Sequence, residues 1–385
     1  MSDNPMLPLS GLRVVALEQA VAAPFCSRQF ADLGADVVKV ERPDGGDFAR
    51  DYDDALHGLS AHFAWLNRGK RSITLDLKQP GDREILARLL ERADVFVHNL
   101  APGAVERLGF GYEALAERLP RLVWCGISGY GPDGPYRDKK AYDLLVQAES
   151  GVVSVTGSAE APAKVGVSIA DIAAGLYGFS SILAALLRRE RTGRGDRVDI
   201  SMLECLAEWM TPALYVWQGT GKAPARTGVR HNMIVPYGAY RCADGMVNFA
   251  VQNEREWQRF CEQALEMPEL AGDERFRTNA LRLENRAVLE AAIEARLGEF
   301  TRAEMLARLD RAGIANGALN DVAALAGHPQ LAARHRWTQA ASPAGAIPAL
   351  VPPHNLRSAP ALVGGVPALG EHNAEVLAEL GLKRE

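Results

Sequence analysis

The first 130 residues alternate short apolar, β-branched runs with segments whose apolar positions repeat at helical spacing. Residues 36–41 (DVVKVE) form one such run, and residues 80–92 (PGDREILARLLER) form one such helical segment. Apolar strands separated by helices are typical of a parallel sheet covered on both faces. The same pattern predicts a helix at 24–34 and further strands at 12–20, 71–77, 94–99, 122–127 and 194–201. Ligands of such sheets bind at the carboxyl ends of the strands, which directs attention to the loops after Ala20, Glu41, Asn99 and Ser128.

The pattern changes after residue 201. Asp244 and Gly245 separate two apolar stretches within 237–251, which predicts a hairpin. Helical segments follow at 254–265 and 285–300, and Thr301 and Glu304 have the spacing of a capping box. We therefore expect an α/β chain with a Rossmann-like parallel sheet and a smaller α+β domain. The expected boundaries are a large domain at 1–200, a linker at 201–230, a small domain at 231–328, and a return segment at 329–385 that ends in a helix from Asn373.

Composition excludes several classes of function. Of the 385 residues, 48% are apolar and 24% are charged, and the net charge of −5 is spread along the chain. This balance indicates a globular protein and does not favour nucleic-acid binding. We expect no membrane span, because no apolar run approaches the roughly 18 residues that one requires, and the N-terminus lacks the features of a signal peptide. We expect a cytoplasmic protein without a membrane or nucleic-acid partner.

Motifs for other chemistries are missing from the sequence. Five widely separated cysteines and eight histidines without ligand spacing predict buried thiols and no metal site. The loop after the first strand has no G-x-G-x-x-G, and neither a P-loop nor a G-x-S-x-G elbow occurs, so a bound nucleotide cofactor is not expected.

Asp171 is the most unusual position in the chain. It lies in the apolar segment 165–187 (VGVSIADIAAGLYGFSSILAALL), whose only ionisable groups are Asp171 and Tyr177. A helix is expected to begin near Asp171, so this carboxylate could simply be a helix N-cap. Alternatively, a carboxylate that the helix dipole keeps ionised in a partly desolvated place could attack an acyl group. The local sequence fits both interpretations.

Polar groups at the predicted loop positions favour a phosphate-bearing ligand. They are Arg42, Lys78, Asn99, Arg107 and Lys140. Each of them alone is better explained as a solvated surface residue, but coenzyme A carries a diphosphate and a 3′-phosphate and needs several such groups together. The small residues Ala22, Ala23 and Gly103 would let its pantetheine arm approach the backbone.

Taken together, these stretches resemble the family III CoA-transferases, which include formyl-CoA transferase and the carnitine CoA-transferases. The matching stretches occur in order along nearly the whole chain: 30–43 (FADLGADVVKVERP), 67–78 (NRGKRSITLDLK), 94–110 (DVFVHNLAPGAVERLGF), 126–135 (GISGYGPDGP), 140–143 (KAYD), 168–175 (SIADIAAG), 194–203 and 367–373 (PALGEHN). The resemblance implies that Asp171 is the catalytic nucleophile. It also implies an interlocked homodimer, in which two chains thread through each other, and CoA or acyl-CoA as a substrate. The positions that it implies for CoA contacts are Ala22, Arg42, Leu75, Lys78, Asn99, Leu100, Arg107, Lys140, Tyr142 and Asp143.

Departures from formyl-CoA transferase point to other acids. Gln19 and Val21 stand where that enzyme has histidine and glutamine, and its glycine-rich loop is replaced by residues 231–236 (HNMIVP), which argues against formate and oxalate. The stretches at 14–29 and 46–54 are more similar to members that use itaconate, mesaconate or citramalate, often with succinyl-CoA as the donor. Candidate residues for binding the acid are Glu18, Gln19, Arg50, Arg230, His231 and Tyr237. A related alternative is an α-methylacyl-CoA racemase, but Tyr142 stands where racemases have a histidine, and a phenol is a poorer base at neutral pH.

Overall fold

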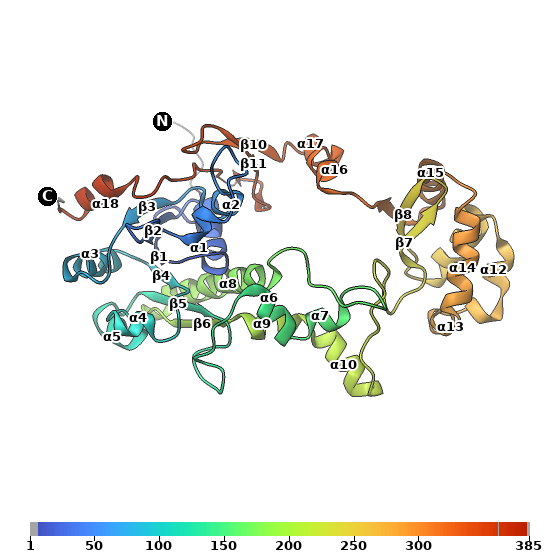
Figure 1. Cartoon of the computed structure of the whole chain (residues 1–385), viewed down its shortest axis with the longest axis horizontal. Coiled ribbons are helices and arrows are strands. Elements are labelled where there is room, and N and C mark those ends of the chain that lie inside the picture. The colour runs from blue at the N-terminus through green and yellow to red at the C-terminus, as the bar shows by residue number, and fades with distance from the viewer. Residues whose placement is uncertain (1–6, 361, 383–385) are drawn as a thin grey trace. The chain divides into compact units, whose positions relative to one another are not determined.

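The computed structural model describes residues 7–360 and 362–382, and the chain separates into two compact units (Figure 1). The first unit comprises the chain up to residue 150, residues 165–211 and the chain from residue 330. The second comprises residues 151–164 and 212–329. The segment expected to be a linker at 201–230 contains two helices, α9 (Met202–Trp209) and α10 (Thr211–Thr220).

A six-stranded parallel sheet forms the centre of the first unit. Its strands lie in the order β3, β2, β1, β4, β5, β6. Their bounds are β1 (Arg13–Leu17), β2 (Asp36–Glu41), β3 (Arg71–Thr74), β4 (Val95–His98), β5 (Val123–Ser128) and β6 (Arg197–Ser201). The fold class and the strands predicted from the apolar runs are confirmed. The strand order reverses between β1 and β4, so the crevice at their carboxyl ends is the expected ligand site.

Helices cover the sheet through two sets of side chains. Alternate strand residues such as Val15, Val38 and Phe96 join a core with α3 (Pro80–Glu91), α4 (Ala104–Arg107), α5 (Tyr112–Arg118) and α18 (Asn373–Glu379). Separately, α1 (Ala22–Asp32) packs closely on α8 (Ile169–Thr192). A Cβ on Gly175 would lie 2.8 Å from the Ala22 carbonyl oxygen. Glycine at this position therefore brings the first turns of α8 beside the start of α1.

One expectation about apolar runs is wrong. Helix α8 is long and apolar enough to cross a membrane by length and composition, with 44% of its apolar window buried inside the structure. Asp171 is a charged residue near the start of this apolar run. In the structure α8 packs against α1, β5 and β6, and the core helices of globular proteins pass the same test.

The remaining elements of the first unit connect these layers. They are η1 (Phe48–Asp51), α2 (Ala61–Asn67), α6 (Asp143–Glu149), the antiparallel pairs β10 (Trp337–Ala340) with β11 (Ile347–Leu350) and β12 (Asn355–Leu356) with β13 (Ala359–Pro360), and α17 (Pro329–Ala333) at its boundary. The predicted helix from Asn373 is confirmed by α18. All five cysteines are free and buried, as predicted.

The second unit is the predicted α+β domain. Its antiparallel sheet has the order β7, β8, β9, and Cys242 pairs with Gly245 across the predicted hairpin turn. Thr301 and Glu304 form the predicted capping box. The elements are α7 (Val152–Val155), β7 (Tyr237–Cys242), β8 (Gly245–Ala250), α11 (Glu254–Arg259), the π-helical turn η2 (Phe260–Leu265), α12 (Pro268–Gly272), η3 (Glu274–Phe276), α13 (Asn279–Glu284), α14 (Arg286–Leu297), α15 (Arg302–Ala312), β9 (Ala315–Ala318) and α16 (Val322–Ala326).

Candidate active site

Two residues join the strand ends at the point where the sheet order reverses. The Gln19 backbone N–H donates to the Asn99 side-chain oxygen at 2.9 Å, and the Asn99 side-chain amide donates to the Gln19 carbonyl at 2.7 Å. Gln19 follows β1 and Asn99 follows β4. The side chain of Asn99, which the resemblance implies to be a CoA contact, therefore fixes the loop after β1 in place.

The next residue, Ala20, has a strained backbone. Its φ of 62° lies in the left-handed region, which costs about 1 kcal/mol for a residue other than glycine. Its N–H donates to the Asp47 carboxylate at 3.0 Å, and Asp47 also accepts from the Ala49 N–H at 2.9 Å. Asp47 thus holds the loop after β1 against the loop after β2.

A buried network of ion pairs holds both Glu18, which directly precedes this loop, and Asp47. Glu18 accepts from Lys70 at 2.6 Å and lies 3.4 Å from Lys39, and Lys39 also pairs with Asp47 at 2.8 Å. These side chains are buried. Burial alone would raise the pKa of Glu18, but Lys70 and Lys39 outweigh it and hold this pKa below its ordinary value. Glu18 was a candidate for binding the acid, but its carboxylate is committed to these two lysines.

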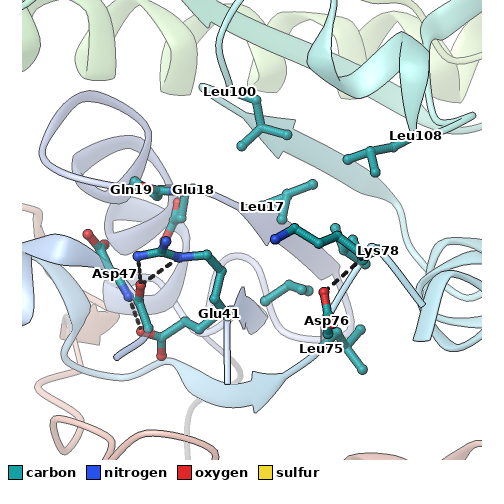
Figure 2. A pocket seen from close by; sticks show the side chains of 14 residues that line it. Leu17, Glu18, Gln19, Glu41, Asp47, Leu75, Asp76, Lys78, Leu100 and Leu108 are labelled. Atoms are coloured by element: carbon teal, nitrogen blue, oxygen red, sulfur yellow. Dashed lines mark hydrogen bonds between the residues drawn. The ribbon is translucent and has the colours of Figure 1, made fainter. Parts of the chain in front are cut away.

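A cleft of about 190 Å³ opens between the ends of β1, β2, β3 and β4. Leu100 and Leu108 line one side, and Leu75 and Lys78 line the other (Figure 2). Six predicted site residues lie in its wall: Glu18, Gln19, Arg42, Leu75, Lys78 and Leu100. Apolar walls with two exposed cations suit a ligand with an apolar body and phosphate groups.

The other predicted CoA positions do not line this cleft. Ala22 is buried at the start of α1, and exposed Arg107 ends α4, with its guanidinium lying over Gly103. Lys140 is exposed in the loop before α6, and Tyr142 and Asp143 begin that helix. The predicted set is thus divided between the cleft and the start of α6.

Asp171 lies in the first turn of α8 but is not its N-cap. The helix begins at Ile169 after Ser168, whose side chain makes no capping bond. Asp143, from α6, supplies the cap instead: its carboxylate accepts from the Ala170 N–H at 2.8 Å and the Asp171 N–H at 3.4 Å. The N-cap interpretation of Asp171 is therefore wrong, because its carboxylate does not cap α8.

The electrostatics of Asp171 differ from the expected ones. Burial, followed by the negative charge of Asp143, raises the pKa of Asp171 to about 7. The expectation that the helix dipole keeps this carboxylate ionised is wrong, because desolvation and a second carboxylate outweigh the dipole. A carboxyl group that titrates near neutrality is typical of functional sites.

Tyr52 lies close enough to Asp171 for the two groups to interact electrostatically. Burial and the nearby groups Asp47, Asp171 and Tyr142 raise the pKa of Tyr52 to about 12, which keeps its phenol protonated. Tyr52 lies just beyond η1, and its ring meets those of Phe48 and His62 at 5.8 and 5.6 Å. Ile172, the residue after Asp171, and Ala20 both pack against the small buried cluster that contains Val21.

The model of the CoA-transferase family III matches residues 9–373 of this chain. The chain belongs to this family.

Individual relatives agree with this assignment. The chain is 40% identical to an acetyl-CoA:oxalate CoA-transferase of Acetobacter aceti over 86% of each sequence. It is 35% identical to a succinyl-CoA:mesaconate CoA-transferase of Haloarcula hispanica over 97% of this chain and 96% of the relative. Among solved structures, a CAIB/BAIF family protein from Brucella suis matches with a TM-score of 0.85 and 36% identity, over 97% of this chain and 99% of that one. This CoA-transferase therefore has the family fold throughout.

Two arginines that were candidates for binding the acid are already engaged in this transferase. The Arg50 guanidinium donates two hydrogen bonds to the Glu41 carboxylate, at 2.7 and 2.9 Å, and lies 3.7 Å from the centre of the Phe63 ring. Arg230, in the second unit, pairs with Glu290 at 2.6 Å and also with Glu294. The structure thus gives both guanidinium groups carboxylate partners within the protein.

The other two candidates in the second unit, His231 and Tyr237, form a stacked pair. The ring of His231 stacks on that of Tyr237 with 5.0 Å between centres, and the His231 N–H donates to the Tyr237 carbonyl at 2.8 Å. A role for this pair in binding the acid stays a prediction.

Sequence reasoning missed several residues of the site. Asp47, Lys39, Lys70 and Tyr52 were not singled out, although Asp47 joins two loops and Tyr52 lies near Asp171. Lys39 offered a signal, because a lysine inside the apolar run 36–41 needs a buried partner.

Proposed function

We propose that this CoA-transferase moves CoA from an acyl-CoA donor, succinyl-CoA, to a short dicarboxylic acid of the itaconate, mesaconate or citramalate type, with Asp171 as the covalent nucleophile. The observation that carries the proposal is the Asp171 carboxyl group: it is largely desolvated, its pKa is raised to about 7, and it is freed from capping by Asp143. A carboxylate of raised basicity is a better nucleophile toward a thioester than an ordinary one.

The proposed reaction conserves the thioester bond energy. The Asp171 carboxylate attacks the carbonyl carbon of the bound acyl-CoA, which gives a mixed anhydride and releases CoA thiolate. The thiolate then attacks the aspartyl carbonyl, so that an aspartyl-CoA thioester forms and the donor acid leaves. The acceptor carboxylate attacks this thioester, giving a second anhydride and thiolate. Attack of the thiolate on the acceptor's carbonyl then forms the new acyl-CoA and restores Asp171.

Geometry supports assigning the cleft to CoA and the start of α8 to the acyl group. Arg42 and Lys78 are exposed cations in the cleft wall, and Leu75, Leu100 and Leu108 supply an apolar surface. Gln19 lines this cleft, and Val21, two residues later, belongs to the apolar cluster against which Ile172, the neighbour of Asp171, packs. A CoA molecule with its phosphates at Arg42 and Lys78 would then extend its pantetheine arm past this loop.

An interlocked homodimer in the cytoplasm completes the proposal. Helix α10 has no buried residue and exposes Leu214, Tyr215 and Trp217, and α8 exposes Leu187. Apolar side chains in such numbers are suited to contact with a second copy of the chain. Five free buried thiols fit a reducing compartment.

Mass spectrometry of the reaction tests the proposal. Purified protein is incubated with succinyl-CoA and, separately, with itaconate, mesaconate, citramalate, glutarate and oxalate. We expect one new acyl-CoA to dominate, and we expect Asp171→Ala to reduce its formation by about a thousandfold or more, because the nucleophile is removed. CoA should be found covalently attached to the peptide that contains Asp171.

Two results would contradict the mechanism. Full transfer by Asp171→Ala would exclude Asp171 as the nucleophile. Exchange of the α-hydrogen of a 2-methylacyl-CoA in deuterated water, without any transfer, would instead support the racemase alternative. Oxalate belongs in the panel because the relative from Acetobacter aceti carries it in its name.

A further inference from the structure

The segment 367–373 (PALGEHN), here called the tail brace, has no part in the proposed chemistry. It precedes α18 and lies beside β3, the edge strand of the parallel sheet. An edge strand presents backbone groups without strand partners, and proteins cover such edges with other segments. The position of the tail brace along β3 shows which part of the edge it covers.

Polar groups of the tail brace pair with the carboxyl half of β3. The Ser72 N–H donates to His372 Nδ1 at 3.2 Å, and the His372 N–H donates to the Ser72 carbonyl at 3.0 Å. Asn373 accepts from the Thr74 N–H at 2.8 Å and donates to the Thr74 hydroxyl at 2.9 Å. Thr74 is the last residue of β3, and Leu75 after it lines the cleft.

The same segment also reaches the loop after β2. The Gly370 N–H donates to the Ser72 hydroxyl at 3.0 Å, and that hydroxyl donates to Glu41 at 2.6 Å. The Leu369 side chain leaves no room for a side chain at Gly46, where a Cβ would lie 2.8 Å from its Cδ1 atom. Glu41 and Gly46 both line the cleft.

Helix α18 is attached to the first unit by contacts other than those of Asn373. Val376, Leu377 and Leu380 of the α18 region are buried in the core that also contains strand residues. Glu379 pairs with Arg71 at 2.6 Å and with Arg13 at 2.9 Å. The two bonds of Asn373 are therefore available to hold the end of β3.

We propose that Asn373 is a positioning residue for CoA binding, which acts through Thr74 to fix the backbone of residues 75–78 in the cleft wall. This inference rests on the proposed function, in which the cleft binds CoA. The two ends of the tail brace hold the two sides of the Arg42 and Lys78 region, since Leu369 contacts Gly46 and Asn373 contacts Thr74. A loop fixed before binding loses less conformational entropy when the ligand arrives.

The test compares Asn373→Ala with a control on the same helix. Glu375→Ala is the control, because it removes an exposed ion pair with Arg71 at the other end of β3. We expect Asn373→Ala to raise the dissociation constant of CoA, measured by calorimetry, and the KM for succinyl-CoA by about tenfold, as expected for the loss of two ordered hydrogen bonds. The kcat should stay within about twofold, because Asp171 is not affected. Glu375→Ala should leave both constants at their wild-type values.

Amide hydrogen exchange without ligand separates this inference from the proposed function. Asn373→Ala should accelerate exchange at Thr74 and residues 75–78, even if the wild-type protein binds no CoA and the proposed function fails. Unchanged exchange, or an equal rise in the CoA dissociation constant for Glu375→Ala, would overturn the inference. If Asn373→Ala does not fold, Thr74→Val removes only the hydroxyl partner. We expect about threefold weaker CoA binding from this variant, and wild-type binding would contradict the role of Asn373.

Discussion

Two carboxylates of the first unit have opposite electrostatics. Glu18 directly follows β1, and Asp171 lies in the first turn of α8. Glu18 is fully buried, yet Lys70 and Lys39 hold its pKa below the ordinary value. For Asp171, the described residues supply no paired cation, and burial with the charge of Asp143 raises the pKa to about 7. Pairing, rather than burial, thus distinguishes the structural carboxylate of Glu18 from that of Asp171, the proposed nucleophile.

Removing the Glu18 charge should have the largest effect on stability. Glu18→Gln leaves Lys70 buried without its carboxylate, and the pKa of Lys70 is already lowered to about 8 by burial against the opposing effect of Glu18. Breaking one side of a buried pair costs about 3–5 kcal/mol. We expect a loss of this size in the free energy of unfolding, measured by urea titration at pH 7.

Glu84→Gln is the matched control for this experiment. Glu84 also pairs with a cation, Arg88, but both side chains are exposed, and such pairs contribute about 0.5 kcal/mol or less. Equal losses for Glu18→Gln and Glu84→Gln would show that the buried network has no special structural role.

The sequence predicts the frame of the site better than its electrostatics. The apolar runs locate the strands, and the apolar surroundings of Asp171 single it out, because these signals are local. Burial contributes most to the raised pKa of Asp171, and a further contribution comes from Asp143, which lies 28 residues away along the chain. A prediction from the helix terminus alone therefore gave the wrong direction.

Long-range partners explain the other differences between prediction and structure. Lys70 lies 52 residues from Glu18, and Asn373 lies 299 residues from Thr74, so neither pairing leaves a local pattern. Arg50 was a plausible ligand for an acid, but Glu41, nine residues away, holds its guanidinium. Which charges meet inside the protein is decided by the tertiary fold.

Neutralising Asp171 should stabilise the protein in a way that depends on pH. Its pKa is about 7 in the folded protein and near 4 in the unfolded chain, so wild-type stability falls as pH rises from about 4 to 7. Asp171→Asn has no carboxyl group to ionise at this position, so its stability does not show this fall. We expect its free energy of unfolding to exceed that of the wild type by about 1–3 kcal/mol at pH 8, with allowance for partial exposure. The excess should shrink toward pH 4, as followed by urea unfolding across this range. A constant difference at all pH values would mean that ionisation of Asp171 is not its cause.

The charge of Asp143 should have the smallest effect, visible mainly in the pH dependence of activity. In the wild type we expect kcat/KM to fall below about pH 7 as Asp171 takes up a proton. Asp143→Asn keeps an oxygen that can accept from the Ala170 N–H but removes the negative charge. The acidic limb should then shift by about one pH unit toward lower pH, because a like charge no longer opposes ionisation of Asp171. Activity on the alkaline plateau should change less than about threefold.

A second carboxylate of α6 provides the control for this shift. Glu149→Gln removes one negative charge from the same helix, but Glu149 pairs with Lys139 at the surface rather than with the α8 terminus. The pH profile of this variant should match that of the wild type. If Asp143→Asn leaves the acidic limb in place, the raised pKa of Asp171 is due to burial alone, and Asp143 serves only as the cap of α8. If the acidic limb shifts in Asp143→Asn but not in Glu149→Gln, the negative charge of Asp143 contributes to the raised pKa of Asp171. Asp171 then differs from Glu18 in two respects: it has a second carboxylate nearby, and it has no paired cation among the described residues.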